Sequence, residues 1–176
     1  MKKTLLLTAF ALLFTAAAAE LKIDFNAEKP WKEMRNHSKR VKFETKEFQG
    51  KKATVVTFAA IDKATDTAFS LETPSFAVKD KKEVTVKFDF AGAKGMQDFK
   101  GGGTWCMAVR FYNSAKKEIT PVNYIKLPAA NGSWQSVTQK IAVPAGAVTA
   151  LAHFGFDHPN ITAQNFFAIT NVSIVY

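Results

Sequence analysis

The sequence predicts an all-β fold, an antiparallel sandwich of two β-sheets. Segments rich in β-branched and aromatic residues recur at intervals of roughly 8 to 15 residues, with turn residues between them. The segment Glu83–Phe90 alternates apolar and polar residues, as expected for a strand with one face on a core. Beyond the N-terminal segment, no stretch repeats apolar residues at helical spacing, which argues against βαβ units.

The N-terminal segment has the three parts of a secretory signal peptide. Lys2 and Lys3 precede an apolar run over residues 4–14, and small alanines follow at 17–19. We expect cleavage before Glu20, so that 1–19 is the signal peptide and 20–176 a single domain, secreted or periplasmic. The alternative is an uncleaved anchor or a buried N-terminal helix, but the apolar run is short for a membrane span.

The domain is predicted to consist of short strands joined by turns. The predicted strands are Leu21–Phe25, Arg40–Phe48, Ala53–Ala60, Ala68–Leu71, Ser75–Val78, Glu83–Phe90, Trp105–Tyr112, Val122–Leu127, Trp134–Val143, Val148–Phe156 and Phe166–Tyr176. The polar stretch Asn26–Ser38 is predicted to be a loop or a single helical turn, with Trp31 plugging the end of the sandwich. The glycine-rich stretch Ala91–Gly103 has the length of a functional or mobile loop. It lacks the strand and Gly-Lys-Ser/Thr context of a phosphate-binding loop.

The chain is basic, with 24 lysines and arginines against 15 acidic residues. Loss of Lys2 and Lys3 with the signal peptide lowers the formal net charge from +9 to +7. This excess favours acidic partners such as acidic polysaccharide, lipid headgroups or cell-wall polymer. Because the lysines are spread beside turns, solubility is the alternative explanation. No nucleic-acid recognition motif is found. The single cysteine, Cys106, excludes an intramolecular disulfide and lies in an apolar run, as a buried residue would.

Motifs in the last third of the chain resemble those of a known family. They are Gly132-Ser133-Trp134, Val143-Pro144-Ala145-Gly146 and the final strand Ala168–Ile174, in that order. This arrangement resembles the jelly-roll carbohydrate-binding modules of the CenC-like, galactose-binding-like superfamily. The likeness covers residues 75–176 closely and 20–74 only in the rhythm of the strands. It implies a jelly-roll sandwich that binds carbohydrate on a sheet face or at a loop end.

One residue departs from the family pattern. The final strand of these modules commonly carries an aspartate that helps to bind structural calcium, and the matching residue here is Thr170. Thr170 lacks the carboxylate that this hard cation prefers. We therefore expect no cofactor, although Asp24, Asn26 and Glu28 could still supply oxygen ligands.

The candidate binding residues are those that strand alternation places on outward faces. They are Asp89, Trp105, Arg110, Tyr112 and His153. An aromatic ring could hold the apolar face of a sugar, and fixed polar groups could bind its hydroxyls. An Arg110–Asp89 ion pair across neighbouring strands is the structural alternative. Trp105 could be a platform or a plug, and His153 could be an ordinary surface histidine. Trp134 is expected to be structural.

The sequence offers no catalytic signature. The three histidines lack the spacing of metal ligands, and Cys106 has no evident base partner. Asp89 and Asp157 could meet as paired carboxylates, but nothing in the sequence shows it. We therefore expect a non-catalytic carbohydrate-binding protein, with an acidic glycan as a possible ligand and no membrane span. The alternative is a structural or assembly protein that uses the sandwich for contacts with a protein partner.

Overall fold

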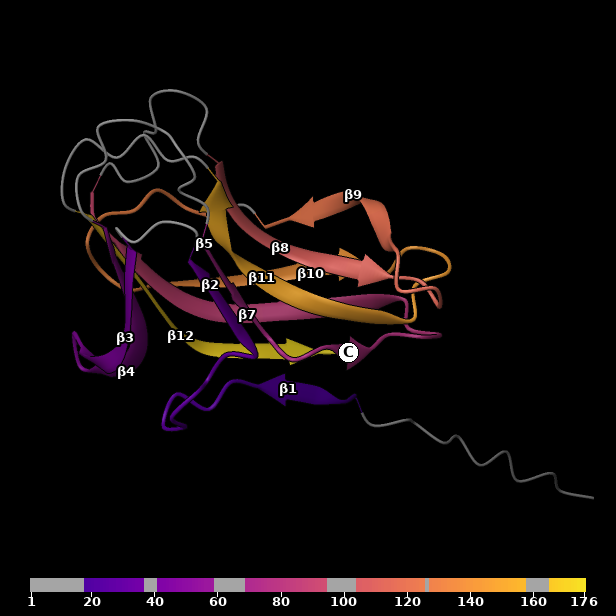
Figure 1. Ribbon diagram of the computed structural model, residues 1–176, viewed down its shortest axis with the longest axis horizontal. Coiled ribbons are helices and arrows are strands. Elements are labelled where there is room, and N and C mark those ends of the chain that lie inside the picture. Colours follow the sequence, from indigo (N-terminus) through magenta and orange to yellow (C-terminus); the bar gives the residue numbers. More distant parts are fainter. Residues whose placement is uncertain (1–17, 37–40, 59–68, 95–103, 126, 158–164) are drawn as a thin grey trace, which may run out of the picture.

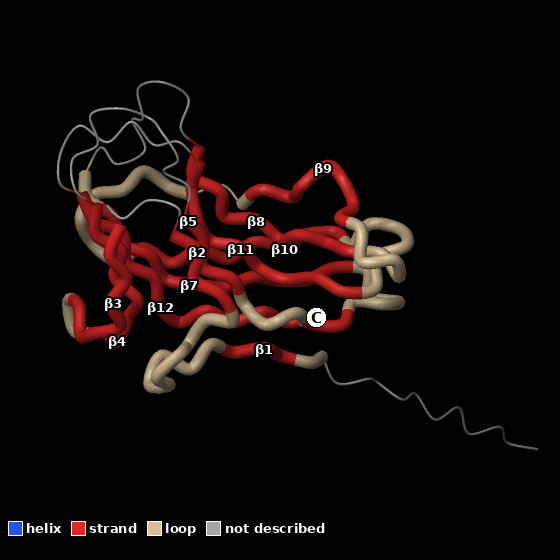
Figure 2. The backbone as a smooth tube through the Cα atoms, viewed as in Figure 1, coloured by secondary structure: helices blue, strands red, loops and turns tan. Residues whose placement is uncertain are grey.

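The computed structural model describes residues 18–36, 41–58, 69–94, 104–125, 127–157 and 165–176, and every regular element in these ranges is a β-strand (Figures 1 and 2). All strand pairs are antiparallel and fall into two sheets, so the predicted β-sandwich is confirmed. Sheet A contains β3 (Val41–Phe48), β4 (Lys51–Phe58), β7 (Glu83–Gly92), β10 (Gln135–Ala142) and β12 (Asn165–Val175), with β1 (Glu20–Lys22) beside β12. Sheet B contains β2 (Glu33–Asn36), β5 (Phe69–Glu72), β8 (Thr104–Tyr112), β9 (Glu118–Tyr124) and β11 (Thr149–Asp157), with β6 (Phe76–Ala77) beside β11.

Neighbouring strands in a sheet are mostly distant in the sequence. The order is β10-β7-β12-β4-β3 in sheet A and β2-β5-β11-β8-β9 in sheet B. The chain changes sheet after β1, β2, β4, β6, β7, β9, β10 and β11, and such repeated crossing between sheets is typical of a jelly roll. Because the strands of one sheet come from both halves of the chain, side chains far apart in sequence share a face. The predicted signal peptide lies outside the described residues, apart from its last two positions.

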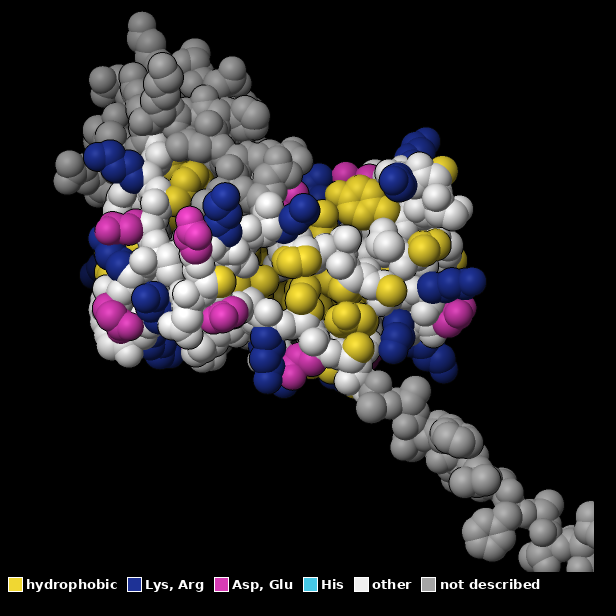
Figure 3. Space-filling model, turned by 60° about the horizontal axis from the view of Figure 1, so that its bottom comes forward, with side chains coloured by type: hydrophobic (Ala, Val, Ile, Leu, Met, Phe, Trp, Pro, Cys, Tyr) yellow, Lys and Arg dark blue, Asp and Glu magenta, His cyan; other side chains and the backbone are white. Residues whose placement is uncertain are grey.

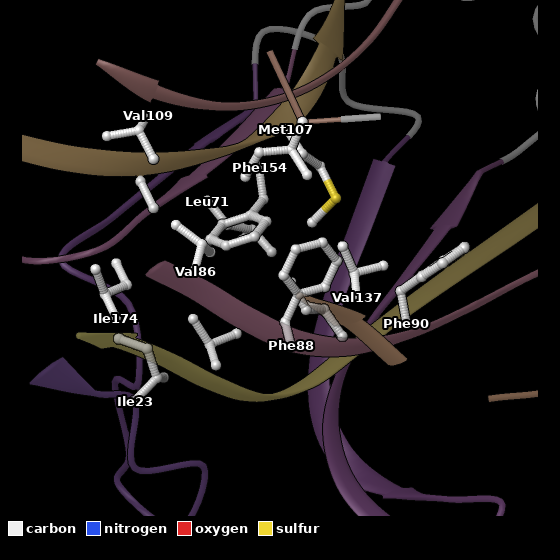
Figure 4. Close-up of a cluster of buried hydrophobic side chains, with 14 of the residues drawn as sticks. Ile23, Leu71, Val86, Phe88, Phe90, Met107, Val109, Val137, Phe154 and Ile174 are labelled. Carbon is white, nitrogen blue, oxygen red and sulfur yellow. The ribbon is translucent and has the colours of Figure 1, made fainter. Parts of the chain in front are cut away.

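The core lies between the two sheets and follows the predicted alternation. Val84, Val86, Phe88 and Phe90 of β7 are at most 2% exposed. Figure 4 shows Val86, Phe88 and Phe90 on the side of β7 that faces Met107, Val109 and Phe154 of sheet B, and the rings of Phe88 and Phe154 meet edge to face with centroids 5.5 Å apart. Burying such side chains away from water is the main favourable term in folding, at about 25 cal/mol per Å² of apolar surface.

Trp31 takes the structural role expected of it. Its side chain is 4% exposed and contacts the rings of Phe25 and Phe154 edge to face. The indole Nε1–H donates a hydrogen bond of 2.9 Å to Thr54 Oγ1, which satisfies its only donor. Trp31 therefore closes the space between the sheets.

Two strands at the edges of sheet B differ most from the sequence prediction. Strand β2 lies within the stretch predicted to be a loop or helical turn. The prediction missed it because its four residues (Glu-Met-Arg-Asn) show no apolar alternation. Its strand form comes from pairing with β5, which a local pattern does not report. Strand β9 begins at Glu118, four residues before the predicted start, and contains Pro121, which a strand accepts only at an edge or bulge. Both strands lie at the edges of sheet B.

Sheet A is strongly curled at the β3–β4 hairpin. Strands β3 and β10 lie at opposite edges of the sheet, yet the Gln49 side chain donates a hydrogen bond of 2.9 Å to the Gly132 carbonyl just before β10. Figure 1 shows the hairpin bending away from the rest of the sheet. The two edges therefore approach each other across the outer face of sheet A.

Candidate functional site

The structure places three of the five predicted site residues on one surface, the outer face of sheet B. Arg110 and Tyr112 lie on β8, where the alternate residues Met107, Val109 and Phe111 are buried. On the adjacent β11, His153 pairs in register with Ala108 and Leu151 with Arg110. These pairings bring Arg110, Tyr112 and His153 onto the same side of neighbouring strands.

His153 lies between an acidic residue on one side and a small alanine on the other, with an exposed aromatic residue one strand beyond the alanine. It pairs with Glu72 of β5, and its Nδ1 lies 3.5 Å from Glu72 Oε1. Ala108, opposite it on β8, pairs in turn with Tyr124 of β9. One row across the sheet thus reads Tyr124, Ala108, His153 and Glu72. The small, buried Ala108 leaves room for its larger neighbours.

Arg110 is held by a carboxylate from the neighbouring edge strand. Its Nη1–H donates to Glu118 Oε2 at 3.1 Å, and both side chains are nearly a third exposed. The Nε–H of Arg110 is buried and has no hydrogen-bond partner among the described residues. The guanidinium is therefore fixed at one end only, which is unusual for a buried donor.

Tyr124 is the large apolar side chain most clearly open to solvent in the described parts of the chain, at 57% exposure. Sequence reasoning missed it, because the candidate residues were taken from strands expected at the centre of the sheets, and Val122–Leu127 was not one of them. Glu72 and Glu118 were missed for a different reason. Each is an acidic residue at the end of a strand, and only the pairing of strands shows that it faces a basic residue.

Asp89 lies on the other sheet, away from Arg110. The alternative of an Arg110–Asp89 ion pair is therefore wrong, because β7 and β8 belong to different sheets and each residue has another partner. Asp89 instead accepts hydrogen bonds from Lys51 Nζ at 2.8 Å, Ser136 Oγ at 2.6 Å and Asn171 Nδ2 at 2.7 Å. Burial raises the pKa of this carboxyl, but the three hydrogen bonds together outweigh it and hold the pKa below the ordinary value of 3.8.

The outer face of sheet A also carries a small apolar cluster. Four small residues of β4, β7 and β12 form its floor, namely Ala53, Val55, Ala91 and Ala168. Phe48 and Trp134 cover them, with ring centroids 5.8 Å apart, and the Lys51 ammonium lies 5.3 Å from the centroid of the Trp134 ring. The Trp134 Nε1–H donates to the Gln49 carbonyl. These contacts agree with the structural role expected of Trp134.

The side chain of Trp105 lies outside what the structure describes, as do those of Cys106 and Asp157. The backbone of Trp105 pairs with Phe156 near the start of β8, on the same strand as Arg110. The glycine-rich stretch beyond Lys94 is also outside the described residues. Whether Trp105 is a platform or a plug stays a prediction.

The residues around Thr170 do not suit a calcium ion. The Thr170 hydroxyl donates a hydrogen bond of 2.6 Å to the Lys52 carbonyl. The adjoining pocket, of about 400 Å³, is lined by Asp24 and Asn26 but also by Lys51 and Lys52, whose positive charges oppose a cation. In the described ranges no three histidine, cysteine or acidic side chains form a group able to hold a metal. The prediction that the protein uses no cofactor remains a prediction.

Comparison with known proteins supports the fold. No family model and no curated protein matches the chain. The chain is similar to part of the enzymatically active domain of tailspike protein 4 of bacteriophage CBA120, with a TM-score of 0.51 and 12% identity over 80% of this chain. It spans only 18% of that tailspike chain. At this identity the likeness shows the fold alone.

Carbohydrate-binding modules are also among the similar solved structures. A family 29 module has a TM-score of 0.49 and 16% identity, covering 91% of this chain and 87% of its own. The CBM22-1 xylan-binding domain of Xyn10C from Paenibacillus barcinonensis has a TM-score of 0.49 and 8% identity, covering 88% and 91%. The more specific CenC-like assignment stays a prediction. Among the described residues, no helix is long and apolar enough to cross a membrane.

Proposed function

We propose that the protein binds a polysaccharide on the outer face of sheet B, without catalysing its cleavage. The proposed binding surface, called the Tyr124 face below, consists of Glu72, Arg110, Tyr112, Glu118, Tyr124 and His153. The observation that carries the proposal is that these residues, from four adjacent strands, share one face of the sheet with an exposed aromatic ring at its edge.

The aromatic part of the face suits the apolar side of a sugar ring. Tyr124 is largely exposed and Tyr112 partly so, and both lie on strands that pair directly. Tyrosine offers a rigid, flat surface with a hydroxyl that can reach a sugar oxygen. Successive rows on one face of a strand lie about 7 Å apart, so the two tyrosines and Arg110 extend over about 13 Å along the strands. This length favours an extended chain over a single small molecule.

The polar part of the face suits sugar hydroxyls, which both donate and accept hydrogen bonds. Each basic side chain lies against a carboxylate, Arg110 against Glu118 and His153 against Glu72. Such pairs hold donors and acceptors in fixed positions before a ligand arrives, which lowers the entropy lost on binding. The Arg110 Nε–H, which no described residue accepts, fits an arginine retained for a ligand rather than for stability.

The non-catalytic part of the proposal rests on the same pairing. A glycosidase needs one carboxyl group that keeps its proton and a second that attacks or activates water. Glu72 and Glu118 each lie against a basic side chain, and they belong to β5 and β9, which β11 and β8 separate in sheet B, so they do not form a close pair of carboxyl groups. Export to the periplasm or the exterior belongs to the proposal as well, and is supported by the signal-peptide pattern of residues 1–19.

A glycan array followed by titration calorimetry tests this function. We expect at least one polysaccharide class to bind, and Tyr124→Ala to weaken that binding about tenfold through loss of ring stacking. Tyr124→Phe keeps the ring and should bind nearly as well as the parent protein. Thr138→Ala, on the outer face of sheet A, is the matched surface control. Absence of any bound glycan, or unchanged binding of every bound polysaccharide by Tyr124→Ala, would contradict the proposal.

One observation favours the alternative of a structural or assembly protein. Tyr124 lies on β9, which is at the edge of sheet B, and an exposed aromatic residue on an edge strand also suits contact with another protein. Sedimentation velocity distinguishes the two. A defined oligomer that Tyr124→Ala dissociates, in a protein with no glycan affinity, would favour assembly.

A further inference from the structure

Three turns meet at the end of the sandwich where β8 and β10 end, and we call this region the lysine end. They are residues 78–82, 113–117 and 143–148. Backbone hydrogen bonds join them: the Val78 N–H donates to the Val148 carbonyl, the Val148 N–H to the Tyr112 carbonyl, and the Val143 N–H to the Lys82 carbonyl. Figure 1 shows the three turns together, at the right of the view. Their side chains therefore present one continuous surface.

The lysine end carries positive charge that the described residues do not neutralise. Five lysines there form no ion pair with a described residue, namely Lys79, Lys81, Lys82, Lys116 and Lys117. Nearby Lys140 is paired with Glu83 at 2.8 Å. Asp80 is the one acidic residue within these three turns. Figure 3 shows several lysine and arginine side chains at the right-hand end of the molecule, with an acidic side chain among them.

A pocket of about 350 Å³ lies between two of these turns. Residues 78–81 form one wall and residues 143–148 the other. The N–H groups of Ala145 and Gly146 on one wall, and of Lys79 and Asp80 on the other, have no hydrogen-bond partner among the described residues. Backbone N–H groups grouped at a turn, beside ammonium groups, form a setting that attracts anions.

We propose that the lysine end is a second binding site, which takes a polysaccharide carrying carboxylate or sulfate groups. One charged sugar residue would enter the pocket, and its neighbours along the polymer would meet the lysines of the adjoining turns. Because the site lies on the turns, it does not depend on the Tyr124 face. The lysine end would select polymers by their charge, whereas the Tyr124 face would select them by the shape of their sugar rings.

The surface suits an anionic polysaccharide better than an anionic membrane. A protein that settles on a lipid surface usually inserts apolar side chains as well as using its basic residues. Tyr124, on the β9 edge, is the exposed large apolar residue of the described chain, and none lies on the three turns. The pocket is concave, whereas a bilayer presents a flat field of headgroups.

Affinity electrophoresis and calorimetry with defined polymers test the site. The probes are polygalacturonate for carboxylate, a sulfated galactan for sulfate, and a neutral galactan of similar length. We expect at least one anionic polymer to bind, more weakly as salt is raised, and the neutral galactan to bind less. The double variant Lys79→Ala/Lys81→Ala should weaken anionic binding about fivefold to tenfold.

Two further variants separate a built site from diffuse attraction. Asp80→Asn removes the carboxylate that lines the pocket and should tighten anionic binding. Lys29→Ala/Lys42→Ala lowers the net charge equally at exposed positions away from the turns and should change binding little. Equal losses in the two lysine pairs would overturn the proposal, as would tight binding to phosphatidylglycerol vesicles but to neither anionic polymer. Tyr124→Ala should bind the anionic polymers as tightly as the parent protein does. This variant therefore separates a failure of the lysine end from a failure of the Tyr124 face.

Discussion

Asp89 combines an outward position on β7 with an almost fully hydrogen-bonded carboxylate. Its three donors come from different strands: Lys51 from β4, Ser136 from β10 and Asn171 from β12. The side chain is 13% exposed, so these hydrogen bonds are partly shielded from water. Asp89 therefore ties four strands of sheet A together at one point, which explains why this predicted ligand-binding residue has a structural role.

The lowered pKa of Asp89 links stability to pH. A group whose pKa is lower in the folded than in the unfolded chain stabilises the fold wherever it is ionised in both states. Asp89 therefore contributes its full stabilisation above the ordinary value of 3.8, and loses it as the pH falls through the lowered folded value. The contribution is small at the most acidic pH and constant near neutrality.

We predict that Asp89→Asn lowers the free energy of unfolding by about 1–3 kcal/mol at neutral pH. The amide cannot accept all three hydrogen bonds, and it leaves Lys51 without its counter-charge. Urea unfolding of parent and variant between neutral pH and well below 3.8 measures the effect, and the difference between them should shrink toward the acidic end. Glu83→Gln, in an exposed ion pair with Lys140, is the control and should change stability little. A difference between parent and Asp89→Asn that is independent of pH would contradict this account.

At the scale of elements, β12 is the strand on which sheet A is arranged. It pairs with β7 along one edge and with β4 and then β1 along the other. Its register with β7 shifts between Thr170 and Ser173, and Asn171 within this bulge has a φ of 53°. Asparagine tolerates this left-handed conformation better than most residues. Its side chain is thereby aimed at Asp89.

Two substitutions at Asn171 separate backbone strain from the lost hydrogen bond. Asn171→Gly keeps the left-handed conformation and removes only the contact with Asp89, at a cost of about 1 kcal/mol. Asn171→Val loses the same contact and also places a β-branched residue in the left-handed region, for about 1–2 kcal/mol more. Thermal and urea unfolding measure both. Equal stability of the valine and glycine variants would mean that the bulge relaxes without strain.

Strand β9 shows how an element at the edge of a sheet can escape sequence reasoning. Its register with β8 shifts between Val109 and Phe111. This irregularity interrupts the alternation by which a strand is recognised in sequence. Tyr124 was overlooked because candidate residues were sought on the central strands, although it is the most exposed aromatic residue of the face proposed to bind sugar.

At the scale of the whole molecule, the described strands share one main core. Its buried residues run from Ile23 near the N-terminus to Ile174 in the last strand, and include side chains of both sheets. A core shared in this way does not allow one sheet to persist without the other. The lysine end, the Tyr124 face and the Asp89 network lie on different surfaces around this shared core.

We predict that the protein unfolds in a single cooperative step, as expected for one domain of this size. Circular dichroism reports the sheets as a whole. Tryptophan fluorescence reports the surroundings of all three tryptophans, among them Trp31 in the core and Trp134 on sheet A. The two urea-unfolding curves should coincide, with equal midpoints and slopes. A fluorescence change that precedes the loss of the sheet signal would show a separable part.

The sequence by itself determined the class of fold and the direction of many side chains. In β7 and β8 the alternation with a period of two residues assigned Val86, Phe88, Met107 and Val109 to the core correctly. This succeeded because alternation is a local property of an extended chain. The same reasoning correctly placed Arg110, Tyr112 and His153 on outward faces.

Only the tertiary structure decided which outward residues meet. Asp89 and Arg110 lie on consecutive strands and were expected on one surface, but β7 and β8 belong to different sheets. Glu118 and Glu72 instead lie beside Arg110 and His153, through pairings that no local pattern reports. The physical reason is that hydrogen bonds between strands, and the burial they allow, depend on segments distant along the chain. The pattern of a single strand indicates which of its side chains share a face. The pairing of strands determines which residues of other strands lie beside them.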